Sequence, residues 1–593
     1  MAEYIVTVNK GVDWQQLHTE LTTDTSGSSI ANIPDRAVTV IKLRPTNNRT
    51  THYDLTVAEA DTLKNDDRVM SVEPAGLGFI VTSKIQDGNF SKTANADGEQ
   101  QNWGLLRHTS ATNIYSDTTD DPGGTYNYVL DGTGVDVVIM ESGIQADHPE
   151  FQDANGVSRV KQIDWFAESG VSGTMPDNHY TDRSGHGTHV ASTVAGKTFG
   201  WAKNADIYVQ TIIENKDREL SIADAFDTLL GWHNAKTNGR PTVVNMSWGY
   251  VLYANTNVSP NTFIDADEHP YAYLTGGSYR GVSHTDVERN DLLSKGATGR
   301  AIGSGLYQVP YIVSSVDVDV EQLTDSGIIV CIAAGNHSIK QDVSGGADYD
   351  NYVTHQGSSF NSNFVGGNDS SLFLTVQDTT EIRQGYIISG TGFTSGQTVE
   401  EVLNGTDLRI SAVPDSQPSG QLTFTTPYTG SFYYNRGSSP RLGSNPGFNV
   451  GAIGNQSPST TQDGKAEYSD GGPAVNIYAA GTNIIGACSN TTTTIFAGIR
   501  RVYYLNTSFW QMNITGTSMA SPQVAGMAAC LLQAHPTWTP TQVVNWFQNN
   551  ATDRIFTTGN SDDYTDTNSL WGSEQRLAYF KLSGSKPFQY IAS

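Results

Sequence analysis

Residues 132–144 read GTGVDVVIMESGI, a short apolar strand pattern bounded by glycines and ending in the carboxylate of Glu141. Further apolar runs of strand length follow at Ile207–Ile213, Val243–Met246 and Ile328–Ala333. An amphipathic helical pattern begins after Ser221, between the first two of these runs. Apolar strands that alternate with helices are typical of a parallel sheet covered by helices on both faces. This part of the chain is therefore predicted to have an α/β fold.

Residues 1–76 form a different pattern, which indicates a separate α+β unit. Strands are expected at Tyr4–Val8, Val38–Ile41 and Val69–Val72, and helices around Trp14–Leu21 and at Ala58–Lys64. The second helix follows Thr56, with Glu59 three residues later, which is the spacing of a capping box. Strands and helices in this order over about 75 residues favour a ferredoxin-like sandwich.

The rest of the chain divides by composition. Residues 77–102 are mostly polar and are expected to be a linker, and residues 103–593 then form the main domain. Two stretches interrupt its α/β pattern. Residues 251–312 are rich in Tyr, Asn, Gly and Ser, and residues 366–428 contain short strand patterns broken by Gly, Asn and Pro, as in a small all-β insertion. The second stretch resembles short β modules of phage tail and virion proteins, so the chain is suspected to be encoded by a phage.

Charge and apolar content exclude several classes of protein. The chain has 593 residues with 35 Lys and Arg against 61 Asp and Glu, a net charge of −26. So strong a negative field argues against binding to a nucleic-acid backbone. The longest apolar run, Gly327–Gly335, has the length of a strand rather than of a membrane span. Three scattered cysteines are too few for a disulfide framework or a zinc cluster. The start, MAEYIVTV, lacks the pattern of an ordinary secretory signal, so we expect a cytoplasmic or virion protein.

Four segments each carry one reactive group among small residues. They are MESG with Glu141, SGHGTHVA with His186, AAGN with Asn336, and GTSMASPQVAG with Ser518. A serine hydroxyl needs an imidazole to take its proton, and the imidazole needs a carboxylate to orient it. A tetrahedral intermediate needs fixed donors, which a side-chain amide and a helix N-terminal N–H supply. Together these groups indicate nucleophilic acyl transfer.

Each group taken alone also has an ordinary structural explanation. A serine at a helix start is usually a cap, and an AAGN sequence is usually a tight turn. His186 and His189 are spaced as in a metal-binding pair, but no third ligand lies nearby in the sequence. His233 is interpreted as a partly covered residue on a helix face that packs against the core. It is the joint occurrence of the four segments, in this order, that favours catalysis.

The segments GTGVDVVIMESGI, SGHGTHVAS, VVNMSWG, AAGN and GTSMASPQVAG resemble the signature blocks of the subtilases, the subtilisin-like serine proteases. The resemblance implies a subtilisin-like catalytic domain over residues 103–593 that acts as a serine endopeptidase on polypeptides. It implies Ser518 as nucleophile, His186 as general base and Asn336 as the oxyanion-hole amide. Ser247, Trp248 and Gly249 match the segment that pairs with the substrate backbone. Chemistry in this family needs no cofactor, and structural calcium is a family-level expectation for which no loop shows defined ligand spacing.

Residues 1–76 resemble the subtilase propeptide (the inhibitor-I9 type), which implies an inhibitor of the chain's own cleft that is removed by cleavage within residues 77–102. One residue departs from the family pattern, because Glu141 stands where subtilases carry aspartate. The additional methylene places the carboxylate about 1.5 Å further out. If the backbone has not retreated, the imidazole is misoriented and activity is attenuated, since about 1 Å of misplacement costs around a hundredfold. Asp136 and Asp182 are weaker candidates for the acid.

Two other functions stay open. The chain is a structural protein of a virion with a catalytically weak or inactive subtilase fold, or a regulatory protease in which residues 251–312 narrow the cleft. The presence of Glu141 in place of the family's aspartate and the β-rich insertions motivate the first alternative. In that case the partners are other virion components. No nucleic-acid or membrane partner is expected in any of the three cases.

Overall fold

The computed structural model divides the chain into two compact units, Met1–Thr82 and Ser83–Ser593. The residues described are 2–27, 29–44, 49–74, 84–92, 100–115, 123–213, 218–255, 272–285, 294–296, 301–303, 306–356, 359–380, 382, 385–425, 430–454, 462–491, 499–553, 555–556 and 563–580. Parts of the predicted linker 77–102 and of the two predicted insertions, 251–312 and 366–428, lie outside these ranges.

The first unit is a four-stranded antiparallel sheet with two helices. Its elements are β1 (Ala2–Val8), α1 (Trp14–Thr22), β2 (Thr39–Lys42), β3 (Thr50–Leu55), α2 (Val57–Leu63) and β4 (Val69–Pro74), and the strand order is β2-β3-β1-β4. The predicted capping box is confirmed, since the Thr56 hydroxyl accepts from the N–H of Glu59 and the Glu59 carboxylate accepts from the N–H of Thr56. Strand β3 was not predicted, because its inward-facing residues alternate with His52 and Asp54 in a stretch that is polar overall.

A seven-stranded sheet forms the centre of the second unit. Its order is β27-β25-β16-β10-β7-β9-β8, and all neighbouring strands are parallel. The strands are β7 (Asp136–Glu141), β8 (Val160–Lys161), β9 (Asp206–Thr211), β10 (Thr242–Met246), β16 (Ile329–Ala333), β25 (Phe448–Ile453) and β27 (Ile477–Ala480). The four apolar runs of the sequence are thus β7, β9, β10 and β16, and the predicted parallel sheet is confirmed.

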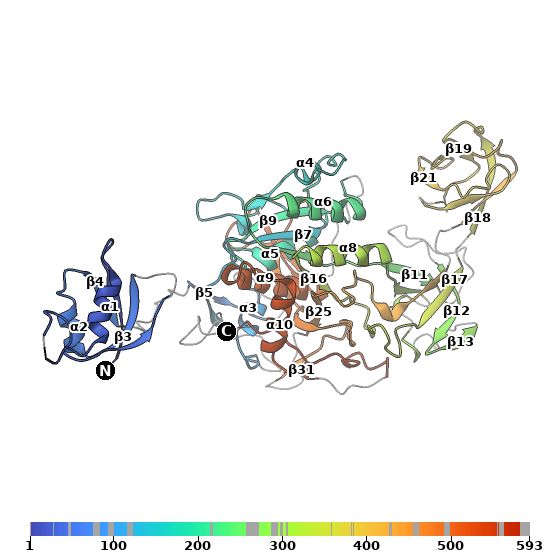
Figure 1. Cartoon of the computed structure of the whole chain (residues 1–593). Helices are drawn as coiled ribbons and strands as arrows, with labels where there is room; N and C mark the ends of the chain where they lie inside the picture. Colours follow the sequence, from blue (N-terminus) through green and yellow to red (C-terminus); the bar gives the residue numbers. More distant parts are fainter. Residues whose placement is uncertain are drawn as a thin grey trace. The chain divides into compact units, whose positions relative to one another are not determined.

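Helices cover both faces of this sheet (Figure 1). One face packs against α4 (Trp165–Ser169), α6 (Ile222–Ala235) and α8 (Ser314–Asp325), and the other against α5 (His186–Ala195), α9 (Thr517–Ala534) and α10 (Pro540–Asn550). Because both faces are buried, the central strands are apolar throughout rather than alternating. The predicted helix after Ser221 is α6, and the Ser221 hydroxyl accepts from the N–H of Asp224 at its start.

A second sheet begins shortly after the carboxyl end of β10, and much of it comes from residues 251–312. Its elements are β11 (Val251–Asn255), β12 (Ala272–Tyr279), β13 (Val282–Thr285), β14 (Ala301–Gly303), β15 (Leu306–Pro310), β17 (Tyr352–Gln356) and β24 (Gly430–Phe432). The order is β14-β15-β11-β12-β17-β24, with β13 paired to β12. Strand β11 continues the chain directly from Ser247–Gly249, and β15 runs antiparallel beside it.

Residues 359–425 form a six-stranded sheet with a hydrophobic core of its own, referred to below as the β18–β23 module. Its strands are β18 (Ser359–Gly366), β19 (Phe373–Val376), β20 (Ile387–Ser389), β21 (Val399–Val402), β22 (Asp407–Ile410) and β23 (Gln421–Thr425). The module follows β17 and precedes β24, which pair with each other in antiparallel register. Its first strand begins before residue 366, where the β-rich composition was first evident in the sequence.

Shorter elements complete the second unit. They are β5 (Lys84–Asn89), α3 (Gly104–Arg107), β6 (Gly123–Tyr128), the 3-10 turns Pro149–Phe151 and Tyr434–Arg436, β26 (Asp463–Gly464), β28 (Ile484–Cys488), β29 (Ile499–Val502), β30 (Trp510–Ile514) and β31 (Ile555–Phe556). Strand β5 lies within the predicted linker and pairs with β6 along its whole length. Leu577 and Phe580, near the end of the described chain, are buried in the main core.

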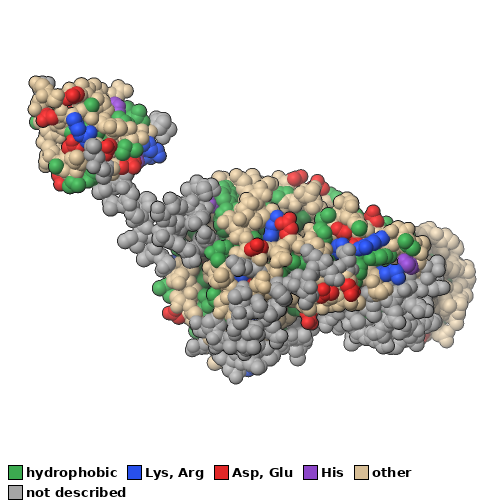
Figure 2. Space-filling view, turned by 90° about the horizontal axis from the view of Figure 1, so that it is seen from below, with side chains coloured by type: hydrophobic (Ala, Val, Ile, Leu, Met, Phe, Trp, Pro, Cys, Tyr) green, Lys and Arg blue, Asp and Glu red, His purple; other side chains and the backbone are tan. Residues whose placement is uncertain are grey.

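The surface shows mixed charges. On the face drawn in Figure 2, acidic side chains lie among basic and uncharged ones over the second unit. Within the described ranges, no helix has the length and apolar character needed to cross a lipid bilayer. The three cysteines, Cys331, Cys488 and Cys530, are buried.

Candidate active site

The predicted reactive residues lie at the carboxyl ends of neighbouring strands. Strands β16, β10 and β7 are adjacent and parallel, and they end at Ala333, Met246 and Glu141. Because parallel strands end at the same edge, this order brings Glu141, the segment after β10 and the AAGN turn after β16 together. Helices α5 and α9 start at this same edge, with His186 and Ser518 in their first turns.

His186 is the first residue of α5 and contacts the carboxylate of Glu141. Its Nδ1 lies 2.8 Å from Oε2 of Glu141, and the carboxylate side chain is 0% exposed against 12% for the imidazole. The other oxygen, Oε1, accepts a hydrogen bond of 3.0 Å from the N–H of Ser247. With both oxygens engaged, the carboxylate is fixed in orientation, and it in turn orients the imidazole.

Helix α5 packs closely against the end of β7 at Gly187. A Cβ at Gly187 would lie 3.2 Å from Cβ of Glu141 and 2.1 Å from the carbonyl oxygen of Gly143. The backbone of α5 can therefore approach the end of β7 closely only because residue 187 is glycine. The Gly185 residue before the helix has φ +88°, a left-handed conformation that glycine adopts without strain.

The other two carboxylates considered for the acid role have different partners. Asp182 accepts hydrogen bonds from the N–H groups of Gly185 and Thr188 at 2.7 and 2.8 Å, and from the Ser142 hydroxyl at 3.0 Å. Burial raises the pKa of Asp182, and these donors oppose the increase. Asp182 thus stabilises the start of α5. Asp136 lies at the opposite end of β7, where its carboxylate pairs with Nζ of Lys236 at 2.9 Å.

Ser518 is joined to Ser247 by two hydrogen bonds in opposite directions. The Ser518 hydroxyl donates to the carbonyl oxygen of Ser247 at 3.1 Å, and the Ser247 hydroxyl donates to the carbonyl oxygen of Ser518 at 3.1 Å. Ser518 is the second residue of α9 and is partly exposed, whereas Ser247 is buried. In the same turn, the N–H of Met519 donates to the carbonyl oxygen of Gly516 at 3.0 Å.

Asn336 lies beside the start of α9. Its Oδ1 accepts from the N–H of Thr517 at 2.8 Å and from the Thr517 hydroxyl at 2.9 Å. Since Oδ1 is occupied in this way, the Nδ2 group remains as a donor. The turn that carries Asn336 is held from behind by Asp470, which accepts from the N–H of His337 at 2.9 Å.

A pocket of about 340 Å³ opens beside these groups. It is lined by Ser247, Trp248, Gly249, Val251, Gln308, Ala333, Gly335, Asn336, His337, Ser438, Ser439, Thr517 and Ser518. All predicted catalytic and substrate-binding residues except Glu141 and His186 line this pocket. Its other walls, Val251 and Gln308, come from β11 and β15 of the second sheet.

Trp248 both lines the pocket and packs in the core. Its side chain belongs to the cluster under α6 and α8, is 8% exposed, and meets the rings of Phe226 and Tyr250 edge-on. Trp248 is therefore both a wall of the pocket and a packing residue of the core.

The remaining histidines of the sequence analysis have structural partners. Nε2 of His189 lies 2.9 Å from the carbonyl oxygen of Ile484, and burial lowers the pKa of His189 to about 3. His233 contacts the Thr242 hydroxyl at 2.9 Å through Nδ1 and the Ser326 carbonyl oxygen at 3.1 Å through Nε2, and burial lowers its pKa too. Across the described ranges, no group of three or more His, Cys, Asp and Glu side chains is arranged to hold a metal ion.

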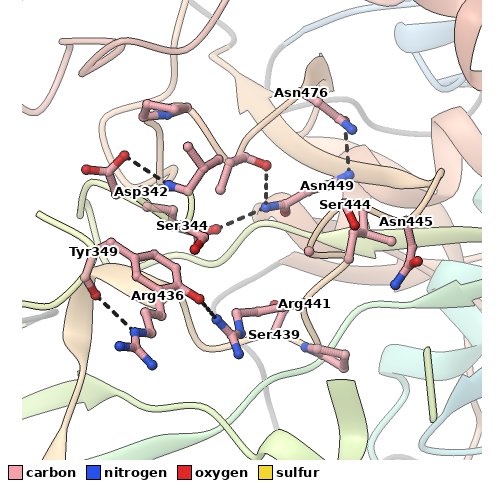
Figure 3. Close-up of a pocket in the computed structure, with 17 residues that line it drawn as sticks. Asp342, Ser344, Tyr349, Arg436, Ser439, Arg441, Ser444, Asn445, Asn449 and Asn476 are labelled. Carbon is pink, nitrogen blue, oxygen red and sulfur yellow. Dashed lines mark hydrogen bonds between the residues drawn. The ribbon is translucent and has the colours of Figure 1, made fainter. Parts of the chain in front are cut away.

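A second pocket, of about 470 Å³, adjoins the first at Ser439 (Figure 3). Its basic side chains are engaged within the protein. Arg441 donates to the Tyr349 hydroxyl at 2.6 Å and to Asp317 at 2.9 Å, and Arg436 donates to the Tyr349 carbonyl oxygen at 3.0 Å.

The upper wall of this second pocket supports the AAGN turn. Asn449 donates from Nδ2 to Oε1 of Gln341 at 3.0 Å, and Gln341 donates from Nε2 to Asp470 at 3.0 Å and to the carbonyl oxygen of Ala334. The polar groups of this pocket thus stabilise the backbone that carries Asn336.

Sequence reasoning did not identify several residues around the site. They are Ser142, Asn245, Val251, Gln308, Ser438, Ser439 and Ser521. Ser142, Asn245 and Ser521 lie within the segments MESG, VVNMSWG and GTSMASPQVAG, so their position was a usable signal. Gln308, Ser438 and Ser439 come from distant segments without a motif, and only the folded chain brings them to the pocket.

The sequence and the structure of the chain are similar to those of known proteins. A family model described as "Subtilase family" matches residues 132–567. "Subtilisin-like protease 5" of Arthroderma benhamiae is 28% identical over 209 residues, which span 34% of this chain and 43% of that protein. "Subtilisin-like protease PopC" of Myxococcus xanthus is 34% identical over 132 residues, or 22% of this chain and 27% of that protein. The chain therefore aligns with less than half the length of these relatives. A solved structure titled "Crystal structure of a cold adapted subtilisin-like serine proteinase" matches 81% of this chain and 97% of its own, with 17% identity and a TM-score of 0.40.

Proposed function

The chain belongs to the subtilase family, and on this basis we propose that it is a serine endopeptidase that hydrolyses peptide bonds through an acyl-enzyme on Ser518. One observation supports the proposal most directly. The carboxylate of Glu141 contacts Nδ1 of His186 at 2.8 Å, at the sheet edge where Ser518 begins a helix beside the Asn336 amide. Such an arrangement of acid, imidazole, hydroxyl and amide is what acyl transfer requires.

In the proposed acylation step, the Ser518 hydroxyl first turns from the Ser247 carbonyl oxygen toward His186. Its oxygen then attacks the carbonyl carbon of the scissile bond while its proton passes to Nε2 of His186. Glu141 accepts from Nδ1–H, which keeps Nε2 as the proton acceptor and stabilises the imidazolium. The C–N bond breaks as His186 returns the proton to the departing amine, leaving an ester on Ser518.

Deacylation repeats these steps with water as the nucleophile. His186 takes a proton from the water, the hydroxyl oxygen adds to the ester carbon, and the Ser518 oxygen leaves with the proton that His186 returns. In both steps the tetrahedral oxyanion is stabilised by Nδ2 of Asn336 and by the N–H of Ser518 at the start of α9. The Thr517 contact with Oδ1 of Asn336 supports this role, because it directs the amide's donor group away from Thr517.

For the substrate, we infer binding as an additional strand along Ser247–Gly249. Backbone hydrogen bonds along such a strand give affinity, while the adjoining pocket selects a side chain. Trp248 and the Gln308 side chain would contact the residue that enters the pocket. This assignment is supported by the pocket, because Ser247–Gly249 and Gln308 line the same cavity as Ser518.

We also infer that the first unit is a ferredoxin-like propeptide that inhibits the cleft until it is cleaved within residues 77–102. The strand order β2-β3-β1-β4, with two helices between the strands, supports this inference. Residues 359–425 are interpreted as an inserted all-β module. A location in a virion or in the cytoplasm stays a proposal. A structural calcium ion is also a proposal, and we assign no described residue to it.

A fluorophosphonate probe tests the proposed function, because it reacts with serines that are activated by a neighbouring base. We expect the protein from which the first unit has been cleaved to be labelled at Ser518 and to cleave an unfolded protein substrate. Ser518→Ala should abolish both, whereas Ser508→Ala, which changes an exposed serine between β29 and β30, should keep labelling at Ser518. A folded protein that is neither labelled nor active would favour the alternative of a structural virion protein.

A further inference from the structure

The first turn of α9 lacks one hydrogen bond of a regular helix. In an α-helix, the carbonyl oxygen of Ser518 would accept from the N–H of residue 522, and that residue is Pro522, which has no N–H. The Ser247 hydroxyl donates to this carbonyl oxygen at 3.1 Å. A side chain from the sheet thus replaces the backbone donor that the helix lacks, at the residue that carries the reactive hydroxyl.

The direction of this hydrogen bond is set by two further side chains. Nδ2 of Asn245 donates to the Ser247 hydroxyl at 2.9 Å, and the Ser521 hydroxyl donates to Oδ1 of Asn245 at 2.8 Å. Since Asn245 occupies an acceptor site of the Ser247 oxygen, the single hydroxyl proton is directed to Ser518. Asn245, Ser247 and Ser521 are each at most 5% exposed, so water does not compete strongly for these bonds.

The backbone of Ser247 contacts the other groups of the site. Its N–H donates to Oε1 of Glu141 at 3.0 Å, and its carbonyl oxygen accepts the Ser518 hydroxyl at 3.1 Å. One residue therefore connects the acid, through its N–H, with both the backbone and the hydroxyl of the nucleophile.

We propose that the Ser247 side chain is a positioning element for Ser518, required because Pro522 removes the helical donor. This inference rests on the proposed function and goes beyond the backbone role of Ser247 in substrate binding. When the Ser247 hydroxyl is removed, the Ser518 carbonyl oxygen loses its donor and the first turn of α9 can shift. A shift of this turn displaces both the Ser518 hydroxyl and the N–H that stabilises the oxyanion, and displacements of about 1 Å cost around a hundredfold in rate.

Substitutions at both ends of the interaction provide the test. We expect Ser247→Ala to lower kcat about tenfold with KM changed less than about twofold, because the hydroxyl contacts Asn245 and Ser518 rather than the pocket. Ser247→Thr retains a hydroxyl and should stay within about threefold of the wild type. Pro522→Ala restores an N–H at residue 522, so Ser247→Ala should cost less than about threefold in that background.

This double-mutant cycle separates positioning from general stabilisation. The assay uses the full-length protein with a peptide substrate, and the thermal unfolding midpoint of each variant is measured in parallel. An equal loss of kcat from Ser247→Ala with and without Pro522→Ala would overturn the proposal, as would an unchanged kcat in Ser247→Ala. If Ser247→Ala does not fold, the kcat of Ser247→Thr is compared with that of the wild type instead. A decrease in kcat of more than about tenfold in the folded Ser247→Thr variant would overturn the proposal.

The outcome also distinguishes this inference from the proposed function. A wild-type protein that neither turns over peptides nor reacts with the fluorophosphonate overturns both. An active wild type with additive substitutions overturns only the role of the Ser247 side chain, and the proposal of a serine endopeptidase then stands.

Discussion

Oε2 of Glu141 lies 2.8 Å from Nδ1 of His186, so the carboxylate of this glutamate contacts the imidazole directly. Gly187 allows α5 to approach the end of β7, because a Cβ at this residue would lie 2.1 Å from the carbonyl oxygen of Gly143. The site is thus built around glutamate, which gives substitutions at residue 141 a definite direction.

We predict that Glu141→Asp is harmful rather than restorative. The aspartate carboxylate would withdraw about 1.5 Å from His186 and from the N–H of Ser247, and kcat should fall about a hundredfold. Glu141→Gln should cost more, about ten-thousandfold, because its amide N–H favours the wrong tautomer of the imidazole. The measurement is kcat on a peptide substrate, with Glu168→Asp on the exposed side of α4 as control. Equal activity of Glu141→Asp and wild type would mean that the site does not depend on the length of the glutamate, and equal activity of Glu141→Gln would mean that Glu141 is not the orienting acid.

Asn336 is predicted to combine a catalytic donor with a structural acceptor. Asn336→Ala should lower kcat by about a hundredfold to a thousandfold, the usual cost of losing one oxyanion donor. It should also lower the unfolding temperature, since the N–H and hydroxyl of Thr517 lose their acceptor. Asn336→Asp keeps that acceptor and should lower activity without the same loss of stability. If both variants retained wild-type kcat, the oxyanion would have to be stabilised elsewhere.

Pocket specificity is predicted to depend on Gln308. The pocket lining has one ionisable side chain, His337, and its other polar and apolar residues are uncharged, so we expect cleavage after uncharged residues. Gln308→Glu introduces a carboxylate and should raise kcat/KM for Lys or Arg at this position about tenfold relative to the wild type. A library of peptides that vary only in the residue before the scissile bond provides the measurement, with Gln322→Glu on α8 as control. The same preference in both proteins would show that the Gln308 side chain does not contact the substrate.

Buried histidines predict a loss of stability in mild acid. Burial lowers the pKa of His108 to about 3, of His179 to about 4 and of His189 to about 3. The unfolded chain binds these protons near pH 6.5, whereas the folded chain does not until the pH falls to about 4. The contribution of these histidines to the free energy of unfolding should therefore be constant above pH 6.5. Below that value, the free energy of unfolding should decrease as the pH falls.

His189→Gln tests this prediction in a Ser518→Ala background, which prevents self-digestion. The glutamine amide can donate to the carbonyl oxygens that Nε2 of His189 contacts, but it does not titrate. Its unfolding midpoint should fall less steeply than that of the parent between pH 6.5 and 4.5. Parallel curves would indicate that His189 does not contribute to the acid sensitivity.

Self-cleavage is predicted to release the first unit. N-terminal sequencing of the wild-type protein should find a new terminus within residues 77–102, and Ser518→Ala should keep the original one. Mixing the two proteins distinguishes cleavage in cis from cleavage in trans. A terminus within 77–102 in isolated Ser518→Ala would show that another protease makes the cut.

The parallel sheet and the elements that carry the reactive residues were predictable because their signals are local. The apolar run before Glu141 and the small residues around His186 and Ser518 lie within single elements. The walls at Val251 and Gln308 were not predictable, since they depend on pairing between β11 and β15 across a stretch without periodicity. The contact of the Ser247 hydroxyl with Ser518 was not predictable either, because the two residues lie 271 positions apart in the chain. Strand β3 was missed for a local reason, the polar residues that face outward from it.

The β18–β23 module enters from β17 and returns through β24, and these two strands are paired with each other. Both ends of residues 359–425 therefore leave the second sheet at the same place. A segment attached in this way behaves as a removable cassette, since a short turn between β17 and β24 would close the gap without moving either strand. Deletion or replacement of residues 359–425 would therefore leave the register of the second sheet and the positions of the proposed catalytic residues unchanged.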